Sequence, residues 1–494
     1  MPDYKKLQNG SDIRGVAIAV EGGKPVDLTE AAVRAIGGAF AGWLQSRLGE
    51  GAKRISIGRD SRLSGEQLCA WLRDGLSAAG MEVTDFGLCT TPAMFMSTVM
   101  EGWEFDGAVM ITASHLPFER NGFKFFTAKG GLEKQDIAAI LASAGAGDFP
   151  AGGAGACSRA DFLPAYAELL QKKIRSATGM EQPLFGLRIL VDAGNGAGGF
   201  FAGKVLAPLG ADTTGSLFLT PDGRFPNHAP NPESAAAMDS IRAAVLEHKA
   251  DFGIIFDTDV DRSSAVDASG REINRNAIVA MAAALIAKDF PGTTVVTDSI
   301  TSDQLTEYLE KCLGLKHLRF KRGYKNVINK AKELNQNGVD SQLAIETSGH
   351  AAYKENYFLD DGAYLATKIV IKTAQLKKAG AGLDVVLSSL EEPKEAIEKR
   401  FSINRADFAD YGQEILCRLE EWVEREGQQI GASLVSPNYE GVRINFDNEQ
   451  VKGWCLLRKS LHDPKLPLNV EVTKGSCSDI VRVIDEFLAD FDVS

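Results

Sequence analysis

Short apolar runs alternate with amphipathic helical stretches through most of the chain, and this alternation restricts its fold more than any other feature. The first strand candidates are residues 54–58, 81–85 and 107–112, and helical stretches lie near 29–48 and 66–79. Further strand candidates lie, in order, at residues 187–192, 253–256, 294–297 and 342–345. This rhythm predicts parallel-rich sheets covered by helices, and its recurrence indicates a repeated α/β unit.

The length of 494 residues predicts several domains, roughly three or four. An Ala- and Gly-rich stretch at 142–155 marks a first boundary. Residues 391–412 are highly charged and are predicted to be a connector, and strands near 441–446, 454–458 and 467–473 precede a closing helix near 477–490. We therefore expect an α/β protein with three consecutive α/β domains, which have mixed sheets, and a smaller C-terminal α+β domain. The expected boundaries are 1–152, 153–271, 272–395 and 396–494.

Charge and apolar content exclude several classes of partner. The net charge is −12, and an acidic chain of this kind is not expected to bind nucleic acid. No apolar run approaches the length of a membrane span, so no membrane partner is expected. Seven scattered cysteines without CxxC spacing are typical of reduced thiols, which predicts a cytoplasmic protein. The oligomeric state is not predicted.

A candidate nucleophile follows the strand at 107–112. The chain continues as Thr112-Ala113-Ser114-His115, and Pro117 with the pair Asn121-Gly122 is predicted to turn it so that Lys124 returns towards the Ser114 hydroxyl. A serine with a histidine and a lysine nearby suits group transfer. The alternative is an ordinary surface turn.

Three carboxylates follow the strand at 253–256. Asp257, Asp259 and Asp261 occupy alternating positions, so an extended loop can direct all three to one hard cation such as Mg²⁺. Arg262 would add a fixed positive charge for a phosphate. An EF-hand is excluded because its sixth and twelfth positions need Gly and an acidic residue, whereas Arg262 and Ala268 stand there. An acidic surface turn is the alternative.

A glycine-rich motif follows the strand at 187–192. Residues 194–199 match G-x-G-x-x-G, and Asp212 stands near the position of the acidic residue in a dinucleotide fingerprint. Because a lone fingerprint is weak, we favour a tight strand-to-helix turn over nucleotide binding.

The remaining polar motifs are less specific when each is taken alone. Glu346 and Ser348 lie two residues apart after a strand candidate, so they could receive adjacent sugar hydroxyls or form a helix cap. The turn at 458–465 holds cations and a hydroxyl, which fits an anion site or a solvated loop. Basic turns at 11–15, 58–62 and 321–325 are expected by default to be solvated.

Taken together, the order and spacing of these motifs resemble the α-D-phosphohexomutase family from about residue 10 to residue 475. The sequence Thr-Ala-Ser-His-x-Pro…Asn-Gly-x-Lys is similar to its phosphoserine loop, and Asp-x-Asp-x-Asp-Arg to its metal loop. Glu-x-Ser-Gly-His resembles the sugar-binding loop, and Arg458 with Ser460 stands where its phosphate-binding loop belongs. The resemblance assigns one loop to each expected domain, around a central cleft.

The resemblance also implies roles for individual residues. Ser114 would be the phosphorylated nucleophile and, with Asp257, Asp259 and Asp261, a metal ligand. Active-site cations would be Arg14, Lys124 and Arg262. His115 and Lys124 are both candidates for proton transfer. The implied substrate-binding residues are Glu346, Ser348, His350, Lys325, Arg458, Ser460, His462 and Lys465.

The activity implied is that of a Mg²⁺-dependent isomerase, a phosphoglucomutase or phosphomannomutase, which interconverts hexose 1-phosphate and hexose 6-phosphate. It would work through a phosphoserine and a bound hexose 1,6-bisphosphate, which also serves as activator and phosphoryl donor. Phosphoglucosamine mutase is the alternative within the class. A phosphoserine phosphatase-like hydrolase and a weakly catalytic sugar-phosphate-binding protein are the alternatives outside it.

The chain departs from the family pattern at four places. Leu116 replaces the usual Asn after Ser-His, and Ile345 stands where Gly commonly precedes the Glu of the sugar loop. Thr347 occupies the position that partly tracks substrate preference. The usual phosphate loop Arg-Pro-Ser-Gly-Thr-Glu-Pro reads Arg-Lys-Ser-Leu-His-Asp-Pro from Arg458. The last change removes a Gly and a Thr that would contact phosphate.

Overall fold

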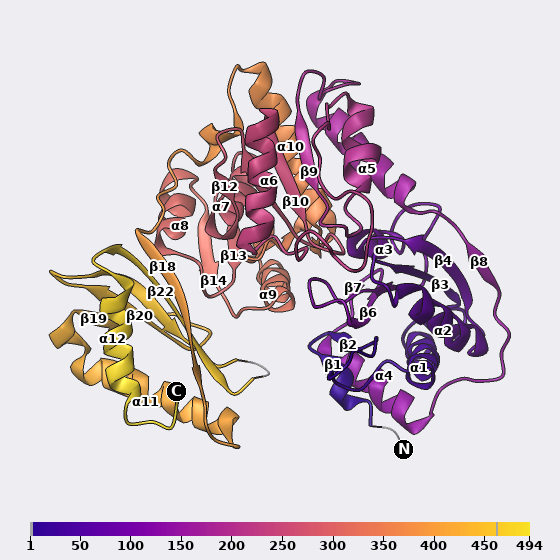
Figure 1. The fold of residues 1–494 in the computed structure, drawn as a ribbon, viewed down its shortest axis with the longest axis horizontal. Coiled ribbons are helices and arrows are strands. Elements are labelled where there is room, and N and C mark those ends of the chain that lie inside the picture. The colour runs from indigo at the N-terminus through magenta and orange to yellow at the C-terminus, as the bar shows by residue number, and fades with distance from the viewer. Residues whose placement is uncertain (1–2, 461–462) are drawn as a thin grey trace. The chain divides into compact units, whose positions relative to one another are not determined.

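The computed structural model describes residues 3–460 and 463–494. Two compact units make up the chain, and each combines two separate stretches of sequence (Figure 1). The first unit comprises Met1–Leu285 and Ser348–Ser388, and the second comprises Ile286–Thr347 and Ser389–Ser494. None of the helices within the described ranges combines the length and the apolarity that crossing a membrane requires.

An eight-stranded mixed sheet opens the first unit. Its order is β1-β2-β6-β5-β3-β4-β8, and β7 pairs with β6. Neighbours among β5, β3, β4 and β8 are parallel, whereas β2, β6 and β5 pair antiparallel. The strands are β1 (Gln8–Asn9), β2 (Asp12–Val16), β3 (Arg54–Arg59), β4 (Glu82–Leu88), β5 (Gly107–Ile111), β6 (Arg120–Thr127), β7 (Gly130–Gly131) and β8 (Cys157–Arg159).

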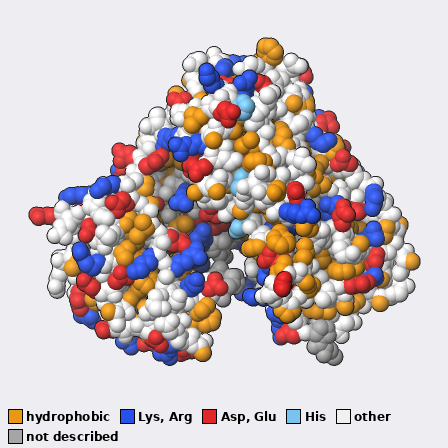
Figure 2. Space-filling view, viewed as in Figure 1, with side chains coloured by type: hydrophobic (Ala, Val, Ile, Leu, Met, Phe, Trp, Pro, Cys, Tyr) orange, Lys and Arg blue, Asp and Glu red, His pale blue; other side chains and the backbone are white. Residues whose placement is uncertain are grey.

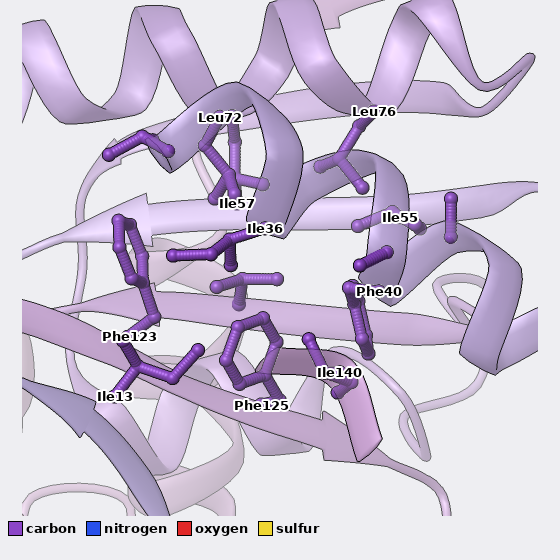
Figure 3. Packing of buried hydrophobic residues seen from close by; sticks show 14 of the residues in the cluster. Ile13, Ile36, Phe40, Ile55, Ile57, Leu72, Leu76, Phe123, Phe125 and Ile140 are labelled. Carbon is purple, nitrogen blue, oxygen red and sulfur yellow. The ribbon is translucent and has the colours of Figure 1, made fainter. Parts of the chain in front are cut away.

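Helices pack on this sheet, and those at residues 5–7, 30–48, 65–78 and 134–146 share one apolar core with it. The helices are η1 (Lys5–Leu7), α1 (Glu30–Leu48), α2 (Gly65–Ala78), α3 (Thr91–Met96) and α4 (Lys134–Ala146). Figure 3 shows Ile36 and Phe40 of α1 meeting Ile55 of β3 and Phe125 of β6 between the layers. All four side chains are withdrawn from solvent, so apolar burial is the main force that holds the layers together.

A second sheet in the first unit has the order β12-β11-β10-β9, in which only β10 and β9 are parallel. Its strands are β9 (Ile189–Asp192), β10 (Phe252–Phe256), β11 (Ser263–Asp267) and β12 (Glu272–Ile273). The same unit contains the antiparallel pair β16 (Ala351–Tyr353) and β17 (Leu359–Asp360). Its other helices are α5 (Leu163–Thr178), η2 (Phe201–Leu206), η3 (Ala207–Leu209), α6 (Ala235–His248), α7 (Arg275–Ala287), η5 (Lys354–Asn356), α10 (Gly362–Lys378) and η6 (Leu383–Leu387).

Within the first unit, α10 packs against α5 although the sequence separates them widely. The buried Tyr166 hydroxyl of α5 donates to the Asp361 carboxylate, 2.7 Å away. Asp361 also caps α10 by accepting from the Tyr364 amide. This carboxylate therefore fixes the start of one helix and the position of another.

The second unit holds three parallel strands in the order β14-β13-β15 and a five-stranded antiparallel sheet in the order β18-β22-β21-β20-β19. The strands are β13 (Thr294–Thr297), β14 (Lys316–Arg319), β15 (Leu343–Ile345), β18 (Glu395–Ser402), β19 (Ala432–Leu434), β20 (Val442–Asp447), β21 (Lys452–Leu457) and β22 (Lys465–Lys474). The helices are α8 (Asp303–Glu307), η4 (Tyr308–Cys312), α9 (Tyr324–Gln336), α11 (Phe408–Glu426), η7 (Gly427–Ile430) and α12 (Cys477–Leu488).

The predicted fold class is confirmed: α/β domains with mixed sheets are followed by a further C-terminal sheet domain. The predicted connector at 391–412 is wrong, because it contains β18, which pairs with β22 along its whole length. This strand lies at a sheet edge, and none of its four charged residues is buried. Charged side chains on an edge strand prevent it from pairing with other molecules. Because such a strand lacks a run of apolar residues, the sequence pattern did not predict it.

Acidic and basic side chains are interspersed over the face of the molecule drawn in Figure 2. The chain as a whole carries a net charge of −12, and the face drawn shows no large patch of one sign. A negatively charged substrate would therefore depend on cations gathered locally in a site.

Candidate active site

Ser114 lies in the loop between β5 and β6 in a backbone conformation that few residues adopt. Its φ is +50°, in the left-handed region where a non-glycine residue is strained. The Ser114 amide donates to the Thr112 hydroxyl at 2.9 Å, and the Ser114 hydroxyl donates to Asp257 Oδ2 at 3.0 Å. Because such strain persists only where surrounding contacts fix it, the loop holds this hydroxyl in one place.

The expectation that Asn121-Gly122 forms the turn is wrong, because both residues lie within β6 and pair with β2. The turn instead occupies residues 112–119. A Cβ at Gly122 would stand 2.1 Å from the Ile13 carbonyl oxygen, so only glycine allows this pairing. The Asn-Gly signal for a hairpin turn therefore reflects close strand approach here.

Asp257, Asp259 and Asp261 converge in the loop between β10 and β11. All three are fully buried, and each offers a carboxylate oxygen within 4.8 Å of the others. Burial, reinforced by the two neighbouring carboxylates, raises the pKa of Asp257 well above its usual value. Burial also opposes ionisation of Asp259 and Asp261, but the surrounding charges and donors, Lys124 foremost among them, together outweigh it and lower the pKa of each.

Lys124 of β6 pairs with two of these carboxylates. Its ammonium lies 3.1 Å from Asp259 Oδ2 and also donates to Asp261 Oδ2. Both contacts join the first sheet of the unit to the second. Lys124 therefore neutralises part of the charge that three buried carboxylates bring together.

The donor set fits a divalent metal ion. Among residues 3–460 and 463–494, Oδ1 of Asp259 and Oδ1 of Asp261 are buried without a hydrogen-bond partner. Such oxygens are costly to bury unless a cation or a donor meets them. Val260 between them has a φ of +68°, a rare value for a β-branched residue, which turns both flanking carboxylates inward. Carboxylate oxygens alone favour Mg²⁺ or a similar hard ion.

Arg262 links the Ser114 hydroxyl to the cluster of three carboxylates. Its guanidinium donates to Asp257 Oδ2 and Ser114 Oγ, both at 3.1 Å, and to Asn231 Oδ1 at 3.1 Å. It also donates to His115 Nδ1 at 2.6 Å. Since a guanidinium only donates, His115 Nδ1 must accept, which leaves the imidazole proton on Nε2.

His115 is therefore a neutral imidazole in this site. Desolvation by the surrounding loop lowers the pKa of His115, although part of the residue is exposed, and the charges of Arg262 and Arg14 act in the same direction. Arg14 stands on β2 and pairs with Asp12 at 2.8 Å. The structure thus brings four sequence-predicted residues, Ser114, His115, Arg14 and Arg262, to one location in the first unit.

His350 joins the same cluster from the start of β16. Its Nδ1 lies 2.9 Å from the Ser348 hydroxyl, and its Nε2 lies 3.6 Å from Asp261 Oδ1. Burial lowers the pKa of His350 to about 3, so this ring is neutral as well. His350 was predicted from the sequence as a substrate-binding residue, and its neighbour in the structure is a candidate metal ligand.

Ser348 lies in the first unit beside His350, whereas the predicted substrate residues Glu346, Lys325, Arg458, Ser460 and Lys465 lie in the second unit. Glu346 accepts a hydrogen bond from the Gly323 amide at 2.6 Å, in the turn that carries Lys325 into α9. Arg458 is buried, and burial together with the charge of Arg322 lowers its pKa. Ser460 is tied to Lys465 by a backbone bond of 2.9 Å. His462 lies outside the described residues.

Sequence reasoning missed Arg62 as a member of the site. Its guanidinium donates to four backbone carbonyl oxygens of the Ser114 loop, and it is only 2% exposed. Its turn was assigned by default to solvent. The position of the turn could have indicated this role, because residues 60–62 directly follow β3, the parallel neighbour of β5.

The glycine-rich motif packs against the metal loop. A Cβ at Gly196 would lie 2.7 Å from the Thr258 carbonyl oxygen, to which the Ala197 amide donates at 2.8 Å. Asp212, the would-be ribose ligand, pairs with Arg188 at 2.7 Å. These contacts support the tight-turn interpretation that the sequence favoured.

Comparison with known proteins gives three successive matches to models of the phosphoglucomutase/phosphomannomutase α/β/α domains. Domain I matches residues 5–150, domain II residues 164–270 and domain III residues 274–388. A phosphomannomutase/phosphoglucomutase of Pseudomonas putida is 30% identical over 443 residues, which are 89% of this chain and 88% of the relative. The chain belongs to the phosphoglucomutase/phosphomannomutase family. The predicted family and the predicted enzyme class, an isomerase that transfers phosphate, are thereby confirmed.

Other members of this family match over nearly the whole chain. A phosphoglucomutase of Neisseria gonorrhoeae is 30% identical over 97% of this chain and 95% of its own length. The crystal structure of a phosphoglucomutase/phosphomannomutase family protein from Burkholderia thailandensis superposes with a TM-score of 0.77 at 25% identity and covers 98% of both chains. Mutases of the family depend on a metal, and the buried carboxylates supply residues that could bind one.

Proposed function

We propose that the chain is a Mg²⁺-dependent mutase that interconverts the 1- and 6-phosphates of glucose or mannose, with Ser114 as the phosphoryl carrier. One observation carries the proposal: the Ser114 hydroxyl lies between Asp257 and Arg262 in a buried cluster of three carboxylates. The names of the relatives support the choice of hexose phosphates as substrates.

The residues around Ser114 fit phosphoryl transfer better than hydrolysis by an activated serine. A Mg²⁺ ion held by Asp257, Asp259 and Asp261 would neutralise charge on the phosphoryl oxygens. Arg262 places a guanidinium beside the serine oxygen, where it can bind the same oxygens. Phospho-Ser114 would pass its phosphoryl group to a sugar hydroxyl: the bond from phosphorus to Ser114 Oγ breaks and a bond to the sugar oxygen forms.

A proton must leave the sugar hydroxyl during this step. His115 Nδ1 is committed to Arg262, and two carboxylates hold Lys124 in its charged form, so neither residue is arranged to accept that proton. His350 is a neutral imidazole beside Asp261 and is a third candidate. The resulting hexose 1,6-bisphosphate would then return its other phosphate to Ser114.

Sugar and phosphate contacts are proposed for residues of the motifs at 346–350 and 458–465 and for Lys325. The Gly323 amide orients the Glu346 carboxylate, which can accept from sugar hydroxyls. Arg458, Ser460 and Lys465 supply cations and a hydroxyl for the phosphate that is not transferred. They belong to the loop that has Leu and His in place of the Gly and Thr usual in the family.

The decisive experiment is transfer of ³²P from labelled glucose 1,6-bisphosphate to the chain with Mg²⁺, followed by mapping of the labelled residue. We expect label on Ser114 and isomerisation of glucose 1-phosphate without matching phosphate release. Ser114→Ala should bind glucose 6-phosphate but neither accept label nor turn over, whereas Ser158→Ala, an exposed serine on β8, should behave as wild type. Stoichiometric phosphate release would establish a phosphatase instead.

A substrate panel separates the alternatives within the class. Glucose, mannose, glucosamine and N-acetylglucosamine phosphates are each tested with the matching bisphosphate. Turnover of glucose or mannose phosphate above the amino sugars supports the proposal, and the reverse order would identify a phosphoglucosamine mutase.

A further inference from the structure

The hydrogen bonds that the Arg62 guanidinium donates to the Ser114 loop, among the residues that the structure describes, all go to backbone carbonyl oxygens. Its Nη2 lies 2.5 Å from the carbonyl oxygens of Ser114 and Leu116, and its Nη1 lies 2.8 Å from that of Pro117 and 2.9 Å from that of Arg120. Hydrogen bonds from a charged donor are stronger than neutral ones, and a planar guanidinium can hold several acceptors in fixed directions. One side chain therefore holds the loop at four points.

A second set of contacts fixes Arg62 itself. The Asp60 carboxylate accepts from the Arg62 amide at 2.8 Å and from the Thr112 hydroxyl at 2.7 Å, and it lies 3.4 Å from Arg62 Nε. Thr112 in turn accepts from the Ser114 amide. Asp60 and Arg62 thus hold the strained residue from both sides, at its amide and at its carbonyl.

Phe225, in the segment before α6, packs over the guanidinium with the Arg62 Cζ atom 5.3 Å from the ring centroid. A Cβ at Gly223 in the same segment would lie 2.4 Å from the Ser61 carbonyl oxygen. The turn that carries Arg62 is therefore enclosed between the Ser114 loop and the 222–225 segment.

These contacts also explain why Leu116 is tolerated in the loop. Arg62 binds the carbonyl oxygen of residue 116, which every amino acid provides, so the loop does not depend on the side chain there. The four bonds draw carbonyl oxygens towards Arg62. A carbonyl oxygen turned towards the Ser114 hydroxyl would instead repel the oxygens of a phosphate on it.

We propose that Arg62 is a positioning residue that holds the Ser114 loop in the conformation needed for phosphoryl transfer and does not itself contact the sugar phosphate. This inference rests on the proposed role of Ser114. It predicts that loss of Arg62 slows transfer to and from Ser114 while substrate binding is retained, because the reacting oxygen moves and the sugar contacts do not.

The test compares Arg62→Ala, Arg62→Lys and a control for general destabilisation. Leu141→Ala removes a buried side chain of α4 from the same domain core, away from the Ser114 loop. For each variant we would measure kcat, KM, the rate of ³²P labelling of Ser114 and thermal unfolding. Arg62→Ala should lower kcat and the labelling rate by about 100-fold, the loss typical of a misplaced reacting group, with KM changed less than threefold.

Chemical rescue separates positioning from folding. Millimolar guanidinium should restore part of the labelling rate of Arg62→Ala, whereas it should do nothing for Leu141→Ala. Arg62→Lys keeps the positive charge but can make fewer hydrogen bonds to the loop, so its labelling rate should lie between those of wild type and Arg62→Ala. If Arg62→Ala does not fold, Arg62→Lys alone provides the test. Should both Arg62 variants label Ser114 at the wild-type rate, or should only KM change, the inference is overturned. Wild-type protein that accepts no label on Ser114 would overturn the proposed function first.

Discussion

The Ser114 hydroxyl lies 3.0 Å from Oδ2 of Asp257, although 143 residues separate them in the sequence. Ser114 follows β5 of the first sheet and Asp257 follows β10 of the second, so two sheets of one unit meet at these loops. A serine next to a buried acidic cluster is suited to exchange a phosphoryl group near a metal ion.

Mg²⁺ should stabilise the chain through the three carboxylates. At a concentration 100 times its Kd, a ligand that binds only the folded state adds about 2.7 kcal/mol to the free energy of unfolding. Asp259→Asn should lose most of this gain, measured as the shift of the melting temperature between EDTA and Mg²⁺. Asp85→Asn, on β4, should keep it. Full activity of the wild type in chelator would contradict the metal assignment.

Arg262→Lys should lower kcat for glucose 1-phosphate by about 100-fold or more, because one ammonium cannot reach Ser114, Asp257, His115 and Asn231 together. A coupled assay for glucose 6-phosphate measures it. Arg188→Lys, which alters the half-exposed pair with Asp212, is the matched control and should stay near the wild-type rate. Equal rates for both variants would show that the fork geometry of Arg262 is unimportant.

Gly122→Ala should destabilise the chain by about 1–3 kcal/mol, because its Cβ would overlap the Ile13 carbonyl oxygen and push β2 away from β6. Gly51→Ala is the control, since a Cβ there meets no atom of the described structure within 4 Å. Urea unfolding of both variants gives the comparison. If Gly122→Ala is as stable as Gly51→Ala, the strands are not held as closely as described.

The pair of His228 and Asp192 should make stability depend on pH. Burial lowers the pKa of His228, but the hydrogen bond and charge of Asp192, 3.0 Å away, outweigh it and raise the pKa above 6.5. A folded-state pKa above the unfolded value gives stability that is full below about pH 6.5 and is lost as pH rises through the folded value. The unfolding free energy of His228→Asn relative to wild type should therefore be lowest near pH 6 and recover by pH 9. An unchanged difference would exclude a charged His228.

The sequence was sufficient to predict those strands and helices whose pattern lies within their own residues. The strands before Ser114 and Asp257 are apolar runs, and the polar residues that follow them stand at strand ends where ligands gather. It was not sufficient for β18, because its charged side chains belong to a sheet edge that only β22 defines. The sequence also could not show that Asn121 and Gly122 lie within a strand. Glycine is needed there because the Ile13 carbonyl oxygen of the neighbouring strand leaves no space for a Cβ.

The candidate site likewise contains residues that the sequence could indicate and residues that it could not. Residue types and spacing identified Ser114 and the three carboxylates, because hydroxyls and carboxylates carry their chemistry in the side chain. Arg62 was missed because its partners are backbone carbonyls, which leave no mark in the sequence. The protonation of His115 also depends on contact with Arg262, 147 residues away.

The first unit is completed by Ser348–Ser388, a stretch that follows part of the second unit in the chain. During synthesis, residues 1–285 leave the ribosome long before β16, β17 and α10 exist. Tyr166 of α5 then has no Asp361 to receive its hydrogen bond, and the cluster around Asp261 has no His350. A nascent chain of the first 285 residues therefore exposes the face of α5 that α10 later covers, and chaperones have most reason to bind it in that interval.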